Sequence, residues 1–314
     1  MRKLTIVVPM YNEEEMIPLF FEEINKVIDQ ITSFNTSILC VNDGSKDGTL
    51  NALKKQREIQ KNIHIVSFSR NFGHEAAVAA GLNHADGDAV IVMDADLQDP
   101  PSLILEMIKK FDEGYDVVNA KRVNRKKDPF LKRVTAEMFY KVIGKLSGKI
   151  KVPNNVGNYR LMSKRVVKLI NELSEKNHVF RVQVPYVGFK TTEVEFVRPE
   201  RPKGETHYNY KSMFKLAGDS ITSSSITPLR WPFKWGIILA IITILIAVIN
   251  VILYFNSVIG NNGLNLTIIG GVISFATSLI LISIGLIGEY IGRVLIESQN
   301  RPLYYVEEEL KEIE

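Results

Sequence analysis

The chain has 314 residues, with 39 Lys and Arg against 35 Asp and Glu and a single cysteine. This length suits one large domain or two smaller ones with a sizeable buried core. The near balance of charge gives no indication of a nucleic-acid partner. One cysteine, Cys40, excludes an internal disulfide and suits a reducing compartment.

Short apolar runs alternate with helical patterns through the first two thirds of the chain. The run at 4–8 leads into a one-sided apolar pattern over 12–31, for which Asn12 is the predicted N-cap and Glu15 its capping-box partner. Later runs lie at 37–41, 63–68, 89–93 and 115–120, and each leads through a polar loop into another helical pattern. This order predicts an α/β fold with a doubly wound, mostly parallel sheet covered by helices on both faces.

Charged residues stand directly after these predicted strands. They are Asp43, Arg70, Asp94, Asp96 and Arg122. Because ligands of such sheets collect at the carboxyl ends of the strands, these side chains are expected to meet at one edge.

The stretch "VIVMDADLQDPP", residues 90–101, runs from an apolar segment into a cluster of acids. In an extended segment Asp94, Asp96 and Gln98 would point to a common side and offer hard oxygen ligands for Mg²⁺ or Mn²⁺. Such an ion keeps positions open for the phosphates of a nucleotide diphosphate. The alternative is a solvated turn that binds nothing, since Asp and Pro are ordinary turn formers. A second carboxylate, Asp43, can accept the imide N–H of uracil.

Two long uncharged or nearly uncharged runs occupy the last third, at about 236–255 and 266–288. Each is long enough, at about 1.5 Å per residue, to cross a hydrocarbon core of roughly 30 Å. The segment between them has no charged residue, whereas basic residues flank the pair, so both chain ends are expected in the cytoplasm.

These patterns divide the chain into four predicted parts: a cytoplasmic catalytic domain at 1–207, an amphipathic segment on the lipid bilayer at 208–233, two transmembrane helices within 234–292, and a cytoplasmic tail at 293–314. The expected location is the cell membrane, with two spans. The spacing of Gly288 and Gly292 is that of a close helix contact and favours a homo-oligomer.

Four segments, "VVPMYNEEE", "VNDGSKDGT", "RNFGHEAAVAAGL" and "VMDADLQDPP", resemble in order and spacing the family 2 glycosyltransferases, in particular the polyprenyl-phosphate branch that includes dolichol-phosphate mannosyltransferase. The C-terminal "GEYIGRVLIESQNRPLYYVEE" resembles bacterial members with two membrane helices. The resemblance implies a GT-A type fold and inverting transfer of a sugar from a UDP-sugar to undecaprenyl phosphate, or another polyprenyl phosphate, at the cytoplasmic membrane face. Glucose and N-acetylglucosamine are the favoured sugars, cell-envelope glycosylation is the expected use of the product, and a flippase is a candidate partner.

The resemblance also implies roles for single residues. The residues implied to bind the nucleotide sugar are Pro9, Tyr11, Glu13, Asp43, Asp94, Asn155 and His207. Asp96 and Gln98 are the implied metal ligands. The implied catalytic residues are Asp96, Arg122 and Arg133, and the two arginines bind the acceptor phosphate. Two guanidinium groups can hold a dianionic phosphate in line with the anomeric carbon.

The chain departs from the family pattern at two places. "NNVGNYRLM" has Asn155 and Asn158 where family members often carry Asp, and "GETHYNYK" has His207 where Lys is common. A carboxylate role is therefore not expected at 155 or 158, and Asn155 and His207 stand only as candidate contacts of the donor.

Two other functions share part of this pattern. A processive polysaccharide synthase would carry the same first four motifs, but "TPLRW" lacks the Gln of a Q-x-x-R-W segment and two spans do not readily enclose a polymer channel. A non-catalytic nucleotide-binding membrane scaffold is the second alternative. A lipid-linked sugar product would exclude the scaffold, whereas full activity after Asp96→Ala would contradict the metal-dependent mechanism.

Overall fold

The computed structural model describes residues 1–123, 153, 155–173, 175, 179–199, 235–238, 241–242, 245, 248–249, 252 and 262–311. The described residues before 221 and after 301 form one compact unit, and those between form a second. Arg133 and His207 lie outside the described residues, so their predicted roles stay predictions.

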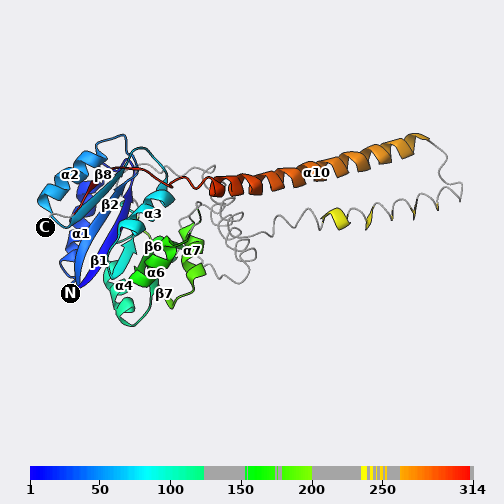
Figure 1. Ribbon diagram of the computed structural model, residues 1–314. Coiled ribbons are helices and arrows are strands. Elements are labelled where there is room, and N and C mark those ends of the chain that lie inside the picture. The colour runs from blue at the N-terminus through cyan, green and yellow to red at the C-terminus, as the bar shows by residue number, and fades with distance from the viewer. Residues whose placement is uncertain are drawn as a thin grey trace. The chain divides into compact units, whose positions relative to one another are not determined.

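The first unit is built on an eight-stranded sheet with the order β7-β5-β6-β4-β1-β2-β3-β8 (Figure 1). Its strands are β1 (Arg2–Met10), β2 (Phe34–Asn42), β3 (Ile63–Phe68), β4 (Ala89–Val92), β5 (Val117–Val123), β6 (Val156–Ser163), β7 (Thr191–Val197) and β8 (Val306–Leu310). Among these strands β6 and β8 pair antiparallel with their neighbours, and the remaining pairings are parallel. The mostly parallel α/β sheet is confirmed.

Helices cover both faces of this sheet (Figure 1). The described helices of the unit are α1 (Ile17–Ile28), α2 (Thr49–Ile59), α3 (His74–His84), α4 (Leu103–Asp112), α6 (Lys164–Asn171) and α7 (Phe180–Val187). One apolar core joins α1, α2 and α4 to side chains such as Ile6 and Ile38, and the other joins α3, α6 and α7 to Val7 and Leu39. Adjacent strand residues thus face opposite cores, which explains why these strands are apolar almost throughout.

The predicted N-cap of the first helix is wrong. The helix begins at Ile17, and its N-cap position is Met16. The carbonyl of Glu13 accepts the N–H groups of Met16 and Ile17, which forms a turn just before the helix. Asn12 instead adopts φ +54°, and its side-chain oxygen accepts the backbone N–H of Lys46 at 2.9 Å. Asn tolerates this left-handed conformation and bonds locally, which gives it a role in joining two loops in place of capping.

The C-terminal residues return to the sheet as β8. This strand pairs antiparallel with β3, with Glu309 opposite Val66 and Leu310 opposite Ile65. The ring of Tyr304 stacks on Phe68 with 4.8 Å between centroids. No periodicity in the sequence indicates this pairing, and the predicted tail at 293–314 is therefore partly an element of the first unit's sheet.

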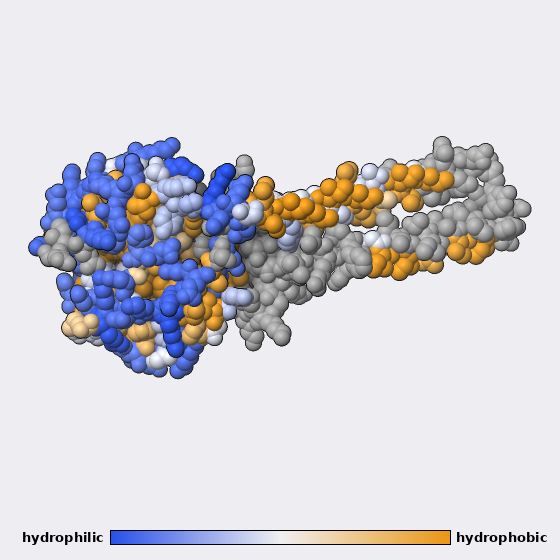
Figure 2. All heavy atoms as spheres, viewed as in Figure 1, coloured by the Kyte–Doolittle hydropathy of each residue, from blue (hydrophilic) through white to orange (hydrophobic). Residues whose placement is uncertain are grey.

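The second unit contains α10 (Asn262–Ser298), which includes the predicted span at 266–288. Within the described part of the chain, one helix is long and apolar enough to cross a membrane, at Phe275–Ser298. Figure 2 shows its described side chains as mostly hydrophobic, in contrast to the hydrophilic surface of the sheet unit. The other predicted span, at 236–255, lies largely outside the described residues, so the two-helix hairpin is not confirmed.

Candidate active site

The acidic stretch after β4 forms a tight turn, and the prediction of an extended segment through Gln98 is wrong. The strand ends at Val92, and Leu97 adopts the left-handed φ of +56°. The turn arises because Asp side chains bond to nearby backbone: Oδ1 of Asp96 accepts the N–H of Gln98 at 3.0 Å, and Oδ2 of Asp99 accepts the N–H of Asp94 at 3.3 Å. Folding the loop on itself brings a third carboxylate into the site.

This third carboxylate, Asp99, is almost completely buried, with 1% of its surface exposed. Burial, followed by the charge of Asp94, raises the pKa of Asp99 to about 7, although Arg122 lowers it in part. Its Oδ1 atom lies 3.6 Å from Nη2 of Arg122 and accepts no hydrogen bond. The loop therefore brings three carboxylates, those of Asp94, Asp96 and Asp99, close to Arg122.

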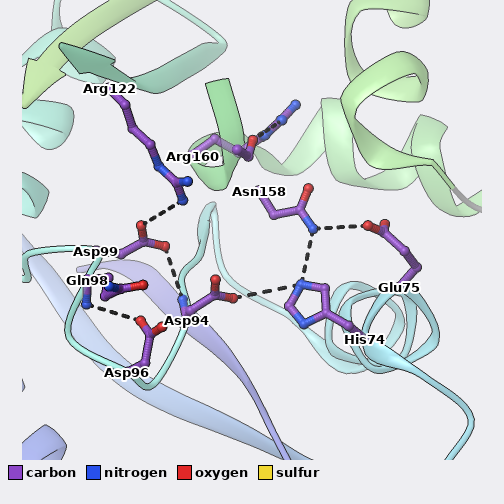
Figure 3. A network of polar contacts seen from close by, with 10 residues as sticks. His74, Glu75, Asp94, Asp96, Gln98, Asp99, Arg122, Asn158 and Arg160 are labelled. Atoms are coloured by element: carbon purple, nitrogen blue, oxygen red, sulfur yellow. Dashed lines mark hydrogen bonds and ion pairs between the residues drawn. The ribbon is translucent and has the colours of Figure 1, made fainter. Parts of the chain in front are cut away.

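Arg122 reaches this loop from β5, as Figure 3 shows. It lies within the strand's last residues, just past a register shift between Asn119 and Lys121. Its backbone N–H donates to the carbonyl of Asn155 at 3.0 Å, and Asn155 has a φ of +61°. The predicted sugar contact Asn155 is thus brought beside Arg122, at the start of β6.

A second polar group approaches Asp94 from the N-terminus of α3 (Figure 3). Nε2 of His74 lies 3.7 Å from Oδ1 of Asp94 and 3.2 Å from Nδ2 of Asn158. The same Nδ2 donates to Oε1 of Glu75 at 3.3 Å. At the position where family members often carry Asp, Asn158 therefore donates a hydrogen bond to a carboxylate supplied by a neighbouring helix.

The loops after β1 and β2 are fastened to each other. The N–H of Asn12 donates to Oγ of Ser45 at 3.0 Å, and the N–H of Glu13 donates to Oγ1 of Thr49 at 2.9 Å. The side chain of Glu14 accepts the N–H of Gly48 at 2.9 Å. Pro9 is buried in β1, and Tyr11 and Glu13 are half-buried beside these contacts, at the same edge of the sheet.

Asp43, after β2, is buried and organises the next loop. Its Oδ1 accepts the N–H of Phe72 at 2.7 Å, and its Oδ2 accepts from Gly73 N–H at 3.0 Å and from Asn71 Nδ2 at 2.9 Å. Burial raises the pKa of Asp43, although these amide donors lower it in part. The structure thus gives Asp43 an internal role, and its contact with uracil stays a prediction.

Asp43→Ala is expected to lower the free energy of unfolding by about 1–3 kcal/mol, because the partly buried backbone N–H groups of Phe72 and Gly73 lose their acceptor. The expected companion effect is weaker donor binding, since the loop at 71–73 loses its anchor. Thermal unfolding and the KM for the nucleotide sugar measure the two effects. The exposed Glu58→Ala in α2 is the control and should change neither; unchanged stability in Asp43→Ala would contradict this role.

A pocket of about 280 Å³ lies beside these loops and is lined by residues that include Asn42, Gly44, Lys46, Ser67, Arg70 and Glu307. Gly44 has a φ of +60°, and a Cβ there would lie 2.2 Å from the carbonyl carbon of Arg70. Only glycine allows the two loops to approach this closely. The acidic turn does not line this pocket, so the pocket and the turn are two separate features of the same edge.

The donor set of the acidic turn fits a hard divalent cation. Asp94, Asp96 and Gln98 offer carboxylate and amide oxygens, the ligands that Mg²⁺ and Mn²⁺ prefer. Burial and then the charge of Asp94 raise the pKa of Asp99, so neighbouring negative charge contributes to the shift. A divalent ion would offset this repulsion, so the residues present match the predicted cofactor.

Two further charged residues of this edge carried no prediction from the sequence. Asp99 lies inside the quoted motif but had no assigned role. Arg198 follows β7, which is parallel to β5, and its side chain is exposed. Partial desolvation and then the charge of Arg122 lower its pKa, while Asp96, Asp99 and Asp94 oppose this. Recognition of 191–197 as a strand would have placed Arg198 by the same rule that placed Arg122.

Comparison with known proteins was consistent with this arrangement. Residues 5–170 match the family model of glycosyl transferase family 2. An uncharacterized glycosyltransferase of Bacillus subtilis, YkcC, is 44% identical over 96% of this chain and 93% of its own length. The bactoprenol glucosyl transferase of Shigella phage SfV is 41% identical over 98% of this chain and 99% of its own length.

Two more proteins, one curated relative and one solved structure, also resemble this chain. The prophage bactoprenol glucosyl transferase homolog of Escherichia coli is 40% identical over 97% of this chain and 98% of its own length. Glucosyl-3-phosphoglycerate synthase from Mycobacterium tuberculosis, solved with Mn²⁺ and UDP-glucose, is 18% identical, with a TM-score of 0.48, over 70% of this chain and 77% of its own. That last likeness is too low to transfer any detail of the site. The family match and the near full-length relatives show that this chain is an enzyme of glycosyltransferase family 2.

Proposed function

We propose that this enzyme transfers glucose from UDP-glucose to a polyprenyl phosphate at the cytoplasmic membrane face, with inversion at the anomeric carbon. The observation that carries the proposal is that the acidic turn at 94–99 faces Arg122. The turn offers ligands for a metal-bound diphosphate, and Arg122 offers a positive charge for an anionic acceptor. The names of the relatives supply the lipid and the sugar, since several are called bactoprenol glucosyl transferases.

The reaction asks little acid–base chemistry of the protein. A phosphate oxygen of the acceptor is already anionic near neutral pH, so it attacks the anomeric carbon without a strong general base. Asp96 and Gln98 would hold the cation, which when bound stabilises the negative charge of the departing diphosphate. Asp94 is the proposed donor-facing carboxylate, and Nε2 of His74 lies 3.7 Å from its Oδ1.

Arg122 is proposed to bind the acceptor phosphate together with Arg133, to which the family resemblance assigns the same role. Arg198 is a further cation beside Arg122, on the neighbouring parallel strand. A guanidinium binds phosphate through paired donors, which orients as well as attracts it. The apolar helix at Phe275–Ser298 is long enough to hold the chain in the membrane that contains such a lipid.

The experiment is a lipid-extraction assay. The full chain in detergent micelles receives undecaprenyl phosphate, Mg²⁺ or Mn²⁺, and one labelled donor at a time: UDP-glucose, UDP-N-acetylglucosamine or UDP-galactose. The expected result is a labelled, acid-labile lipid with UDP-glucose. A lipid product formed only with UDP-N-acetylglucosamine would contradict the proposal that the sugar is glucose. Absence of a lipid product with every donor would contradict the proposed function.

Arg122→Ala is expected to raise the KM for the lipid acceptor by at least about tenfold and to lower kcat, because a charge-assisted phosphate contact contributes about 1.5–3 kcal/mol. The KM for the donor should change less. Steady-state kinetics with each substrate varied separately measure this difference.

The neighbouring Lys121→Ala is the matched control, since Lys121 pairs with Glu193 at 2.8 Å on β7 and not with the acidic turn. Acceptor kinetics equally impaired in both variants would point to general damage of β5 and not to phosphate binding.

A further inference from the structure

A second cluster of metal-ligating side chains lies away from the acidic turn, where the C-terminal strand meets the sheet edge. It consists of His64 on β3, His84 at the last turn of α3 and Glu309 on β8. One carboxylate oxygen, Oε1 of Glu309, lies 3.0 Å from Nε2 of His64 and 3.2 Å from Nδ1 of His84. All three ligand atoms lie within 4.8 Å of one another.

The strand register explains why these side chains meet. Val66 is on the face of the sheet that α3 covers. Glu309 is opposite Val66, and His64 lies two residues before Val66, so Glu309 and His64 are on this same face. The C-terminal end of α3 then supplies His84 from above. The side chains are 13%, 24% and 31% exposed for His64, His84 and Glu309, which leaves solvent access for an ion to enter.

We propose that His64, His84 and Glu309 form a zinc-binding site that fastens the C-terminal strand to the catalytic unit. Two imidazole nitrogens and one carboxylate oxygen are a zinc donor set, completed by water as the fourth ligand. Bonds of about 2.0–2.1 Å place neighbouring tetrahedral ligands roughly 3.3 Å apart, close to the two nitrogen–oxygen separations observed. The two imidazole nitrogens lie within 4.8 Å of each other, so binding of zinc would draw them closer together.

The carboxylate is suited to this role. Its Oε1 atom lies within hydrogen-bond distance of both imidazoles, so one carboxylate oxygen already points to the place where an ion would bind. This set differs from the acidic turn, whose ligands are all oxygen and favour Mg²⁺ or Mn²⁺. The two sites therefore select different metals in one chain.

The site has a structural consequence. Val306–Leu310 follows the apolar helix α10 by a few residues in the chain, and Glu307, two residues before the ligand, lines the pocket beside Arg70. Zinc would hold this strand on β3 and so keep Glu307 at the pocket. Without zinc the strand depends on its backbone pairing and on partly exposed contacts such as Lys54 with Glu308.

The test uses the full chain in detergent, stripped with a chelator and titrated with Co²⁺ as the probe for zinc. A tetrahedral nitrogen-containing site gives strong visible absorption, whereas an octahedral all-oxygen site absorbs weakly. The expected result is one equivalent of strongly absorbing Co²⁺ that Zn²⁺ displaces, retained in Asp96→Ala. His84→Gln and Glu309→Gln should each weaken it by at least about 100-fold.

Glu308→Gln is the matched control, because it alters the same strand but contacts Lys54. Hydrogen exchange of the amides of Val306–Leu310 gives a second readout, and Zn²⁺ should slow it in the unaltered chain and not in His84→Gln. Since His84 is outside the strand, loss of metal with β8 still paired separates ligation from misfolding. No strong Co²⁺ spectrum, or equal binding by His84→Gln, would show only a hydrogen-bonded cluster and overturn the proposal.

Discussion

Asp96→Ala is expected to abolish transfer of sugar to lipid, with a fall in kcat of at least about 100-fold, because a preorganised charge that stabilises the leaving group is lost. The carboxylate is 6% exposed and lies at the centre of the acidic turn. The measurement is turnover with labelled donor at saturating Mn²⁺, together with Mn²⁺ affinity by isothermal titration. Affinity for Mn²⁺ should fall in parallel with kcat.

Asp96→Asn separates charge from loop geometry. The amide keeps an oxygen that can accept the N–H of Gln98, so the turn is preserved while the negative charge is removed. It should lose activity nearly as far as Asp96→Ala but unfold at the same temperature as the unaltered enzyme. The control is Asp86→Asn, an exposed carboxylate that pairs with Lys3 and should keep full activity. Undiminished transfer by Asp96→Ala would contradict the proposed role of Asp96 in the mechanism.

Asp99→Asn is expected to stabilise the metal-free enzyme at pH 8 and to leave it nearly unchanged at pH 4. The pKa of this carboxyl is raised from 3.8 to about 7 in the folded state, mainly by burial and then by Asp94. Between these values the folded state binds the proton more tightly than the unfolded state, so stability falls as pH rises from about 4 to about 7. The neutral amide avoids that loss, which amounts to roughly 2–4 kcal/mol.

Thermal unfolding of both proteins across pH 4–8, in chelator, measures this effect. Mn²⁺ should narrow the difference, because a bound cation offsets the charge that raises the pKa of Asp99. Asp112→Asn is the control, since that exposed carboxylate pairs only with Arg2 among its described contacts and should not alter the pH profile. Destabilisation by Asp99→Asn at pH 8 would show that the ion pair with Arg122 outweighs burial.

Much of the site was predictable because its residues follow strands that are readable from local pattern. Asp43, Asp94, Asp96 and Arg122 all lie at the carboxyl edge of the sheet, as expected from where each apolar run ends. The errors were in local geometry. Asn12 joins two loops instead of capping a helix, and the acidic stretch turns at Leu97 instead of extending.

These errors share a physical cause. Asn and Asp can bond to their own helix terminus, to a neighbouring loop or to backbone two residues away, and sequence spacing does not choose among them. The choice depends on which donors the fold brings near. Ser45 and Lys46 lie more than thirty residues from Asn12, so their competition with the helix terminus is invisible in a local window.

The sequence by itself determined the α/β sheet, the apolar C-terminal segment, the glycosyltransferase family and most of the edge at which we propose that the chemistry takes place, because period, composition and motif order are local properties. Only the tertiary structure decided the pairing of β8 with β3, the cluster of His64, His84 and Glu309, and the charge state of Asp99. Strand pairing uses backbone groups that every residue carries, and a pKa depends on burial among distant neighbours. Neither the strand pairing nor the pKa can therefore be predicted from the order of nearby residues.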